Sequence, residues 1–301
     1  MPPDNLKTMN PYGQASTRSA RTAKILQFPQ PQTRKLLVPR EHGSWGLWLL
    51  PLITGAVVGA ATNPGPSDGT ILWFCAGFAA AFLAYQPLEA LLGISPLKTR
   101  TPEEKQLAAT WVILAGFVAT VSAVQLIIAG RGHVLLFALL AAACFALRTL
   151  FSKLRALRST RQILGALALS STGAASYYVI AGKIDRTALV LWGASWVFAA
   201  AQIEYVQLQM HTAGARSRAE KARAGWKVYL FHLALLIITI AAAVTGHAPA
   251  LLALIFIPAM ARLVFWALSR PRKIDFYLLG FSELLQSVTF SSLLMIAFLW
   301  R

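Results

Sequence analysis

The chain has 301 residues, of which 56% are hydrophobic and only 13% are charged. Soluble globular domains carry about twice that share of charged residues, so the composition excludes an ordinary soluble protein and predicts one that crosses a membrane several times. Lys and Arg total 28 against 11 Asp and Glu, a net charge of +17. Because the cations cluster between apolar segments, membrane topology accounts for them and no nucleic-acid partner is needed.

The first 37 residues are rich in Pro, Gln, Ser, Thr and Arg, with Asp4 as their single acidic residue. Such a segment buries too little apolar surface to offset the entropy of ordering, so residues 1–37 are expected to form a disordered basic tail. The tail lacks the apolar core of a secretory signal, although its composition also fits an organellar transit peptide. We predict that it lies in the cytoplasm.

Apolar segments of roughly 18 to 25 residues follow, the length that a helix needs to cross ~30 Å of hydrocarbon. The nine expected spans are 43–61, 70–92, 107–129, 133–150, 161–182, 187–210, 226–246, 248–268 and 275–300. The sequence therefore predicts an all-α polytopic membrane helix bundle over residues 38–301. Cys75 and Cys144 both lie inside apolar segments, where buried free thiols are the ordinary expectation.

Positive charge is distributed very unevenly between the two sides of the predicted membrane bundle. The tail and the connections that would share its side hold 23 of the 28 Lys and Arg residues. The opposite side holds four, namely Arg131, Lys183, Arg186 and Arg301. Cytoplasmic loops carry the excess of Lys and Arg, so we predict that the amino terminus lies inside and the carboxyl terminus outside.

Four glutamates lie in or beside the apolar segments: Glu41, Glu89, Glu204 and Glu283. Each ionisable residue costs about 2.5 to 3.5 kcal/mol at the centre of a membrane helix, so such residues usually face a bundle interior or a wet cavity. With the amino terminus inside, all four belong to the cytoplasmic half of the membrane. A polar site at that side is therefore predicted.

Helical spacing groups further polar residues with two of these glutamates. Gln86 and Glu89 share one helix face, as do Glu204, Gln207 and His211. Such stripes indicate either a functional site or a structural role, in which the residues reach to water or form hydrogen bonds between helices. The second interpretation is preferred for three glutamines, Gln202, Gln209 and Gln286.

Arg262 and Glu283 fall at the same expected depth, about 12 Å into adjacent antiparallel helices. Because burying one charge alone costs far more than burying both, the sequence predicts a structural ion pair between them. The connection 148–161 holds five cations and no acid, which suits anionic headgroups or a phosphate-bearing ligand, although topology alone explains it. The chain has no P-loop, GxGxxG, CxxC or HExxH pattern.

The run PREHGSWGLWLLP, residues 39–51, resembles the start of the first span in the YwiC-like family of bacterial membrane proteins. The run GFSELLQSVTFSSLLMI, residues 280–296, looks like the closing helix of that family, with Gly280 and Glu283 at matching positions. The resemblance extends over residues 38–301 and implies a multi-pass protein of the bacterial inner (cytoplasmic) membrane. It implies no particular reaction.

A more distant similarity is to the UbiA superfamily of intramembrane prenyltransferases. It lies in the expected number and topology of the spans, in the connections after spans two and six, and in the run at 152–182. In that superfamily, aspartate motifs hold Mg²⁺ on an allylic diphosphate, because a hard cation needs oxygen ligands. Here Tyr85 falls on the asparagine of the first motif. The five aspartate positions fall on Gln86, Glu89, Gly93, Glu204 and Leu208, so two of the five keep a carboxylate.

This resemblance implies a cavity open to the cytoplasm, with Glu89 and Glu204 as its catalytic carboxylates and Mg²⁺ as a candidate cofactor. The implied ligand-binding residues are Glu41, His42, Gln86, Lys98, Arg100, Arg155, Gln207 and His211. For Glu41 and His42, the alternative is a helix cap at the membrane surface.

The sequence thus favours a UbiA-like membrane protein that binds a prenyl- or quinone-type lipid, with divergent prenyl transfer as one interpretation. A non-catalytic accessory or assembly subunit, which kept the fold and lost the metal site, is the alternative. A small-solute or proton-coupled transporter is a third hypothesis, which the lack of a visible internal repeat disfavours. The substrate, oligomeric state and protein partners stay open.

Overall fold

The computed structural model describes residues 42–63, 69–94, 99, 101–151, 158–215, 217–269 and 274–300. In these ranges all regular elements are helical. They are α3 (His42–Thr62), α4 (Thr70–Leu91), α5 (Pro102–Ile128), α6 (Val134–Leu150), α7 (Arg158–Ala181), α8 (Arg186–His211), α9 (Arg218–Ala224), α10 (Trp226–Val244), the 3₁₀ turn η3 (Ala250–Leu254), α11 (Ile257–Leu268) and α12 (Phe276–Leu299). The predicted all-α polytopic bundle is confirmed. The predicted tail, 1–37, lies outside the described residues.

Eight helical segments of the described chain are long and apolar enough to cross a membrane. The ninth predicted span is α6, an apolar helix of 17 residues. Two boundaries differ from those predicted by more than three residues. α5 begins at Pro102, since Thr101 caps it and proline favours the first turn of a helix. The span predicted as 248–268 starts as η3, and α11 begins only at Ile257, with Pro258 in its first turn.

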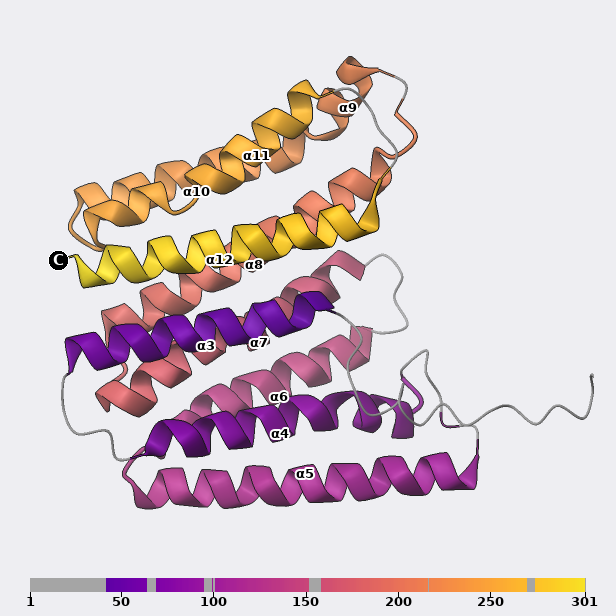
Figure 1. Ribbon diagram of the computed structural model, residues 1–301, viewed down its shortest axis with the longest axis vertical. Coiled ribbons are helices and arrows are strands. Elements are labelled where there is room, and N and C mark those ends of the chain that lie inside the picture. Colours follow the sequence, from indigo (N-terminus) through magenta and orange to yellow (C-terminus); the bar gives the residue numbers. More distant parts are fainter. Residues whose placement is uncertain are drawn as a thin grey trace, which may run out of the picture.

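Figure 1 shows the helices stacked in an elongated row. α4, α5 and α6 occupy one end of the long axis, α3 and α7 the middle, and α8, α10, α11 and α12 the other end. α7 packs on α3, α6 and α8, and it is the most buried of the candidate spans. The middle of the molecule is therefore the α3–α7 pair.

The contact between α3 and α7 is close because small residues meet there. A methyl group added to Gly55 would overlap the carbonyl oxygen of Gly173. Ser176 Oγ donates to Leu52 O (2.9 Å), and Thr172 Oγ1 lies 2.9 Å from Trp48 O. Small residues and hydroxyl-to-carbonyl bonds are the usual means of joining helices in lipid, where the hydrophobic effect supplies little.

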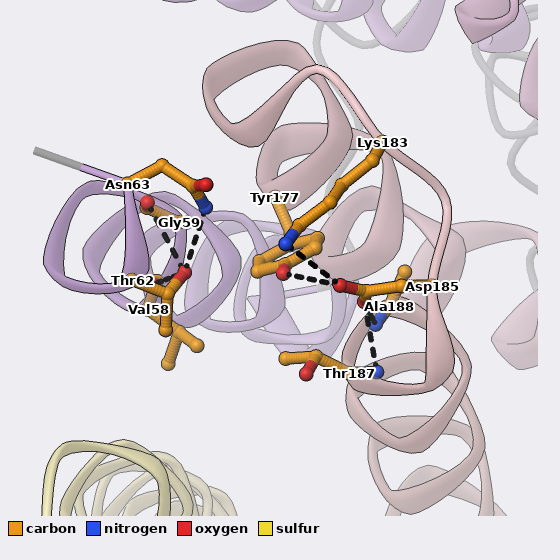
Figure 2. Close-up of polar contacts among 9 residues, drawn as sticks. All are labelled: Val58, Gly59, Thr62, Asn63, Tyr177, Lys183, Asp185, Thr187 and Ala188. Carbon is orange, nitrogen blue, oxygen red and sulfur yellow. Dashed lines mark hydrogen bonds and ion pairs between the residues drawn. The ribbon is translucent and has the colours of Figure 1, made fainter. Parts of the chain in front are cut away.

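The two ends of the helices define two faces of the bundle. We call the end at which α3 begins the proximal face and the end at which α12 stops the distal face (Figure 1). Figure 2 shows a polar cluster at the distal face, where Asp185 accepts from Tyr177 Oη (3.0 Å) and lies 3.5 Å from Lys183 Nζ. Asp185 also caps α8 through Thr187 N and Ala188 N.

These contacts fix the ionisation of the Asp185 carboxyl group. Burial raises its pKa, but the bonds from Ala188 N and Tyr177 Oη and the neighbouring Lys183 outweigh burial, so the pKa is lowered overall. A charged Asp185 therefore ties the end of α7 to the start of α8.

Candidate functional site

A pocket of about 410 Å³ lies between α4, α5, α6 and α7. The residues of α4 that line the pocket recur every three or four positions, so they share one face of the helix. Its lining residues are Trp73, Phe74, Gly77, Phe78, Ala81, Ala84, Tyr85 and Leu88 from α4; Ala119, Ser122, Ala123 and Leu126 from α5; Val134, Leu135, Phe137, Ala138, Ala141, Ala142 and Phe145 from α6 with its first turn; and Ser171, Thr172 and Ala175 from α7. The wall is almost wholly apolar.

The pocket exists because its four helices pack in two pairs. α5 packs along α4, and α6 packs along α7, with fewer contacts between the pairs. Alanines line much of the facing surfaces, so short side chains leave the intervening space unfilled. Aromatic rings stand at both ends of the pocket, with Phe74 and Phe78 toward the distal face and Tyr85 and Phe145 toward the proximal face.

A charged cluster stands at the proximal end of this pocket. Tyr85 Oη donates to Glu89 Oε1 (2.7 Å), and Arg148 Nη2 lies 3.6 Å from the same oxygen. The Arg148 guanidinium also lies over the Tyr85 ring, 5.1 Å from its centroid, and Phe145 meets that ring edge-on. α4 and α6 are thus joined where the pocket ends, and the Glu89 carboxylate already faces a cation and a hydroxyl donor.

The other predicted carboxylate lies elsewhere. Glu204 is on α8, which contributes nothing to the pocket lining and packs on α7, one of the four pocket helices. Gln207, on the same face of α8, donates from Nε2 to Gln162 Oε1 of α7 (2.6 Å). His211 Nδ1 lies 2.8 Å from Gln207 O in its own helix. The structure therefore groups Glu89 with Tyr85 and Arg148, and a site shared by Glu89 and Glu204 stays a prediction.

Several predicted ligand-binding residues lie outside the described part of the chain. They are Glu41, Lys98, Arg100 and Arg155, together with the side chain of His42, whose backbone begins α3. Gln86 is described on α4, half-buried and one turn before Glu89, but it is not among the lining residues. The predicted roles of these six residues are therefore not tested by the geometry.

Within the described part of the chain, the residues at the pocket do not fit the Mg²⁺ site that the UbiA resemblance implies. Mg²⁺ requires several oxygen ligands in near-octahedral order. The lining residues include no carboxylate, and Glu89, beyond the pocket end, already faces Arg148. In the described ranges no three His, Cys, Asp or Glu side chains gather as a metal site would require.

The predicted ion pair between Arg262 and Glu283 is present, with Arg262 Nη1 2.6 Å from Glu283 Oε1. Arg262 Nη2 also donates to Gln202 Oε1, and the guanidinium lies 3.9 Å from the centroid of the Tyr205 ring. One arginine therefore connects α8, α11 and α12. Gln286 Nε2 donates to Pro258 O (3.4 Å), so Gln202 and Gln286 both join helices, as predicted.

Sequence reasoning missed two buried charged residues at the proximal face. Lys221 of α9 is only 4% exposed, and its Nζ donates to Trp266 O and to Ser269 Oγ at the end of α11. Burial, with a smaller effect of nearby Arg218, lowers the pKa of Lys221. Glu104 is 1% exposed in the first turn of α5. The sequence did contain a signal for Glu104, because Thr101 and Glu104 have the spacing of a capping box.

Comparison with models of known protein families finds a match to part of the chain. Residues 38–178 match the model of the YwiC-like protein family. This match confirms the resemblance seen at residues 39–51, and it contains every residue that lines the pocket. The resemblance of residues 280–296 lies outside the match and stays a prediction. No curated protein and no solved structure is significantly similar to the chain.

Proposed function

We propose that this YwiC-like membrane protein lies in the bacterial inner membrane and binds a prenyl- or quinone-type lipid in the pocket between α4 and α7. The observation that carries the proposal is the apolar pocket of about 410 Å³. Small-molecule sites have volumes of roughly 300 to 1,000 Å³ and mostly apolar and aromatic walls with a few polar groups. The pocket has that size and that kind of wall.

The shape of the pocket favours a chain-like ligand. Its α4 wall runs from Trp73 to Leu88, which is about 22 Å along the helix at 1.5 Å per residue. Because α4 crosses the membrane, this long dimension is parallel to the tails of surrounding lipids. A compact polar solute would leave most of such a wall unused, whereas an isoprenoid chain would cover it.

We propose that the lipid is held rather than chemically altered, as in an accessory or assembly subunit. Glu89, the carboxylate nearest the pocket among the implied catalytic residues, faces Arg148 and Tyr85. That arrangement makes it a structural anion between α4 and α6. Prenyl transfer is the alternative, and the experiment below separates the two.

Filling the pocket should remove lipid binding. Ala141 of α6 lines the pocket, whereas Ala143, two residues away, is exposed and is not a lining residue. We expect Ala141→Trp to abolish retention of a quinone or polyprenyl lipid, because the indole would occupy the space of the chain. Ala143→Trp is the matched control and should retain wild-type amounts. The measurement is mass spectrometry of the lipids that co-purify with the full-length chain.

Equal lipid content in the two variants would contradict the pocket as the binding site. Stabilisation of the protein by Mg²⁺ with a prenyl diphosphate, lost in Glu89→Gln and in Glu204→Gln, would favour prenyl transfer instead. This follows because only a ligand that binds the folded state raises the melting temperature.

A further inference from the structure

We infer that the hydroxyl group of Ser122 hydrogen-bonds to a ring oxygen of the bound lipid, so that the pocket selects a quinone-type lipid over a plain hydrocarbon chain. This inference rests on the proposed function and adds to it both the position of the ring and the residue that recognises it.

Ser122 is the lining hydroxyl that the protein itself leaves unsatisfied. Its side chain is 1% exposed, and Oγ has no hydrogen-bond partner in the described part of the chain. The other lining hydroxyls are bonded. Tyr85 Oη donates to Glu89, Ser171 Oγ donates to Ala168 O (2.7 Å), and Thr172 Oγ1 lies 2.8 Å from Leu169 O. Buried polar groups are normally paired, so an external partner for Ser122 is expected.

A trapped water molecule is a poor candidate for that partner. A buried water usually makes about three hydrogen bonds and needs two to four polar neighbours. Most residues that line the pocket are apolar, Phe74, Phe78 and Leu126 among them. A carbonyl oxygen attached to an apolar ring needs one donor and gains contact with the wall, so it suits this environment better.

The residues opposite Ser122 provide a place for such a ring. α4 and α5 approach closely there, because a methyl group on Gly77 would lie only 2.8 Å from Ser122 Cβ. Phe74 and Phe78 stand on either side of Gly77 on α4, with ring centroids 6.2 Å apart. Aromatic side chains favour offset or edge contacts with a flat π-system. Ser122, Phe74 and Phe78 therefore combine one donor with two rings.

The rest of the pocket suits an isoprenoid chain. From Gly77 to Tyr85 the α4 wall extends about 12 Å toward the proximal face. Over this distance it presents Ala81 and Ala84, opposite alanines of α6. Short side chains leave a smooth apolar channel, so the ring would lie toward the distal face and the chain would point toward Tyr85.

The test compares two ligands in two variants of the full-length chain in nanodiscs. The ligands are a short-chain ubiquinone and a ring-free isoprenoid hydrocarbon of the same length. Ser122→Ala should weaken ubiquinone binding by about three- to tenfold, the usual effect of losing one neutral hydrogen bond. It should leave hydrocarbon binding unchanged or strengthen it, because the unpaired hydroxyl is removed. Thr120→Ala, which deletes an exposed hydroxyl bonded to Gly116 O, should change neither affinity.

Infrared spectroscopy supplies a readout that general loss of structure would not reproduce. A carbonyl stretch of bound ubiquinone should be lowered in the wild type and return toward its free frequency in Ser122→Ala. Equal ubiquinone affinity and an unshifted carbonyl stretch would overturn the inference. If that result were found and Ala141→Trp still abolished binding, the proposed function would stand and only the role of Ser122 would be withdrawn. If neither ligand bound the wild-type chain, both proposals would fail.

Discussion

Arg262 is a single side chain that holds three helices, so its removal has consequences beyond one lost ion pair. It pairs with Glu283, donates to Gln202 and lies over the Tyr205 ring. The side chains of Arg262 and Glu283 are 14% and 19% exposed. Removing one partner strands the other charge in an apolar environment, whereas replacing both removes the penalty together with the attraction.

We therefore expect Arg262→Met and Glu283→Met each to lower the free energy of unfolding by about 3–5 kcal/mol. The double variant should lose less than either single variant. The measurement is a double-mutant cycle by titration with a denaturing detergent, in which coupling appears as non-additivity. Thr289→Ala on α12 is the control, since its exposed hydroxyl bonds to Leu285 O of its own helix, and it should change stability by less than about 0.5 kcal/mol. Additive losses would mean that the pair is not coupled.

At the residue level, sequence reasoning succeeds where depth decides the contact. Arg262 and Glu283 were predicted to pair because the helical rise converts their distance from a loop into a depth in the membrane. The pairing of Glu89 with Arg148 was not predicted, since it depends on how α4 and α6 approach each other. Ser122 carries no sequence signal at all, because an isolated serine in an apolar helix usually bonds to its own backbone.

Among the helical elements, the α3–α7 pair is the contact that tolerates least change. Gly55 meets the backbone of Gly173, and Ser176 bonds across the interface to Leu52 O. A side chain at Gly55 meets backbone, which cannot rotate away as a flexible side chain would. The interface thus depends on the absence of one methyl group.

Gly55→Ala should accordingly destabilise the bundle by about 1–3 kcal/mol, the usual cost of overpacking. Gly46→Ala is a matched control on the same helix, because a methyl group there meets none of the described residues within 4 Å. It should be neutral or stabilising by up to about 1 kcal/mol, since alanine favours a helix more than glycine does. Thermal unfolding in detergent measures both. Equal melting temperatures for the two variants would show that α3 and α7 are not in such close contact.

The helices themselves were largely predictable, because hydrocarbon thickness sets their length and composition marks them. The errors occurred where capping and proline override hydropathy. Thr101 and Pro102 extend α5 toward the proximal face by one polar turn that contains Glu104. Pro258 starts α11 late and leaves η3 as a separate turn. Hydropathy counts apolar residues and does not detect either effect.

At the scale of the whole molecule, the structure separates two kinds of interior. The helices α4 to α7 enclose an apolar pocket, whereas α8, α11 and α12 are joined by the buried polar contacts of Arg262. α3 and α7 lie between α4, α5 and α6 on one side and this second group of helices on the other (Figure 1), and α7 also forms one wall of the pocket. The YwiC-like match, residues 38–178, covers α3 to α6 and most of α7 and so includes the residues that line the pocket. The proposed lipid site and the polar contacts of Arg262 thus lie on different helices.

The orientation of the molecule in the membrane is predicted by its cations, 23 of which were assigned to the cytoplasmic side and four to the other. After Cys75→Ala and Cys144→Ala, single cysteines at Ile184 and Ala213 test this prediction. Both positions are exposed, Ile184 at the distal face and Ala213 at the proximal face. A membrane-impermeant maleimide added to intact cells should label Ile184→Cys and miss Ala213→Cys until the membrane is permeabilised. An impermeant reagent reaches only cysteines on the outer side of the membrane. The reverse labelling pattern would therefore place the proximal face, with Glu89 and Arg148, outside the cell.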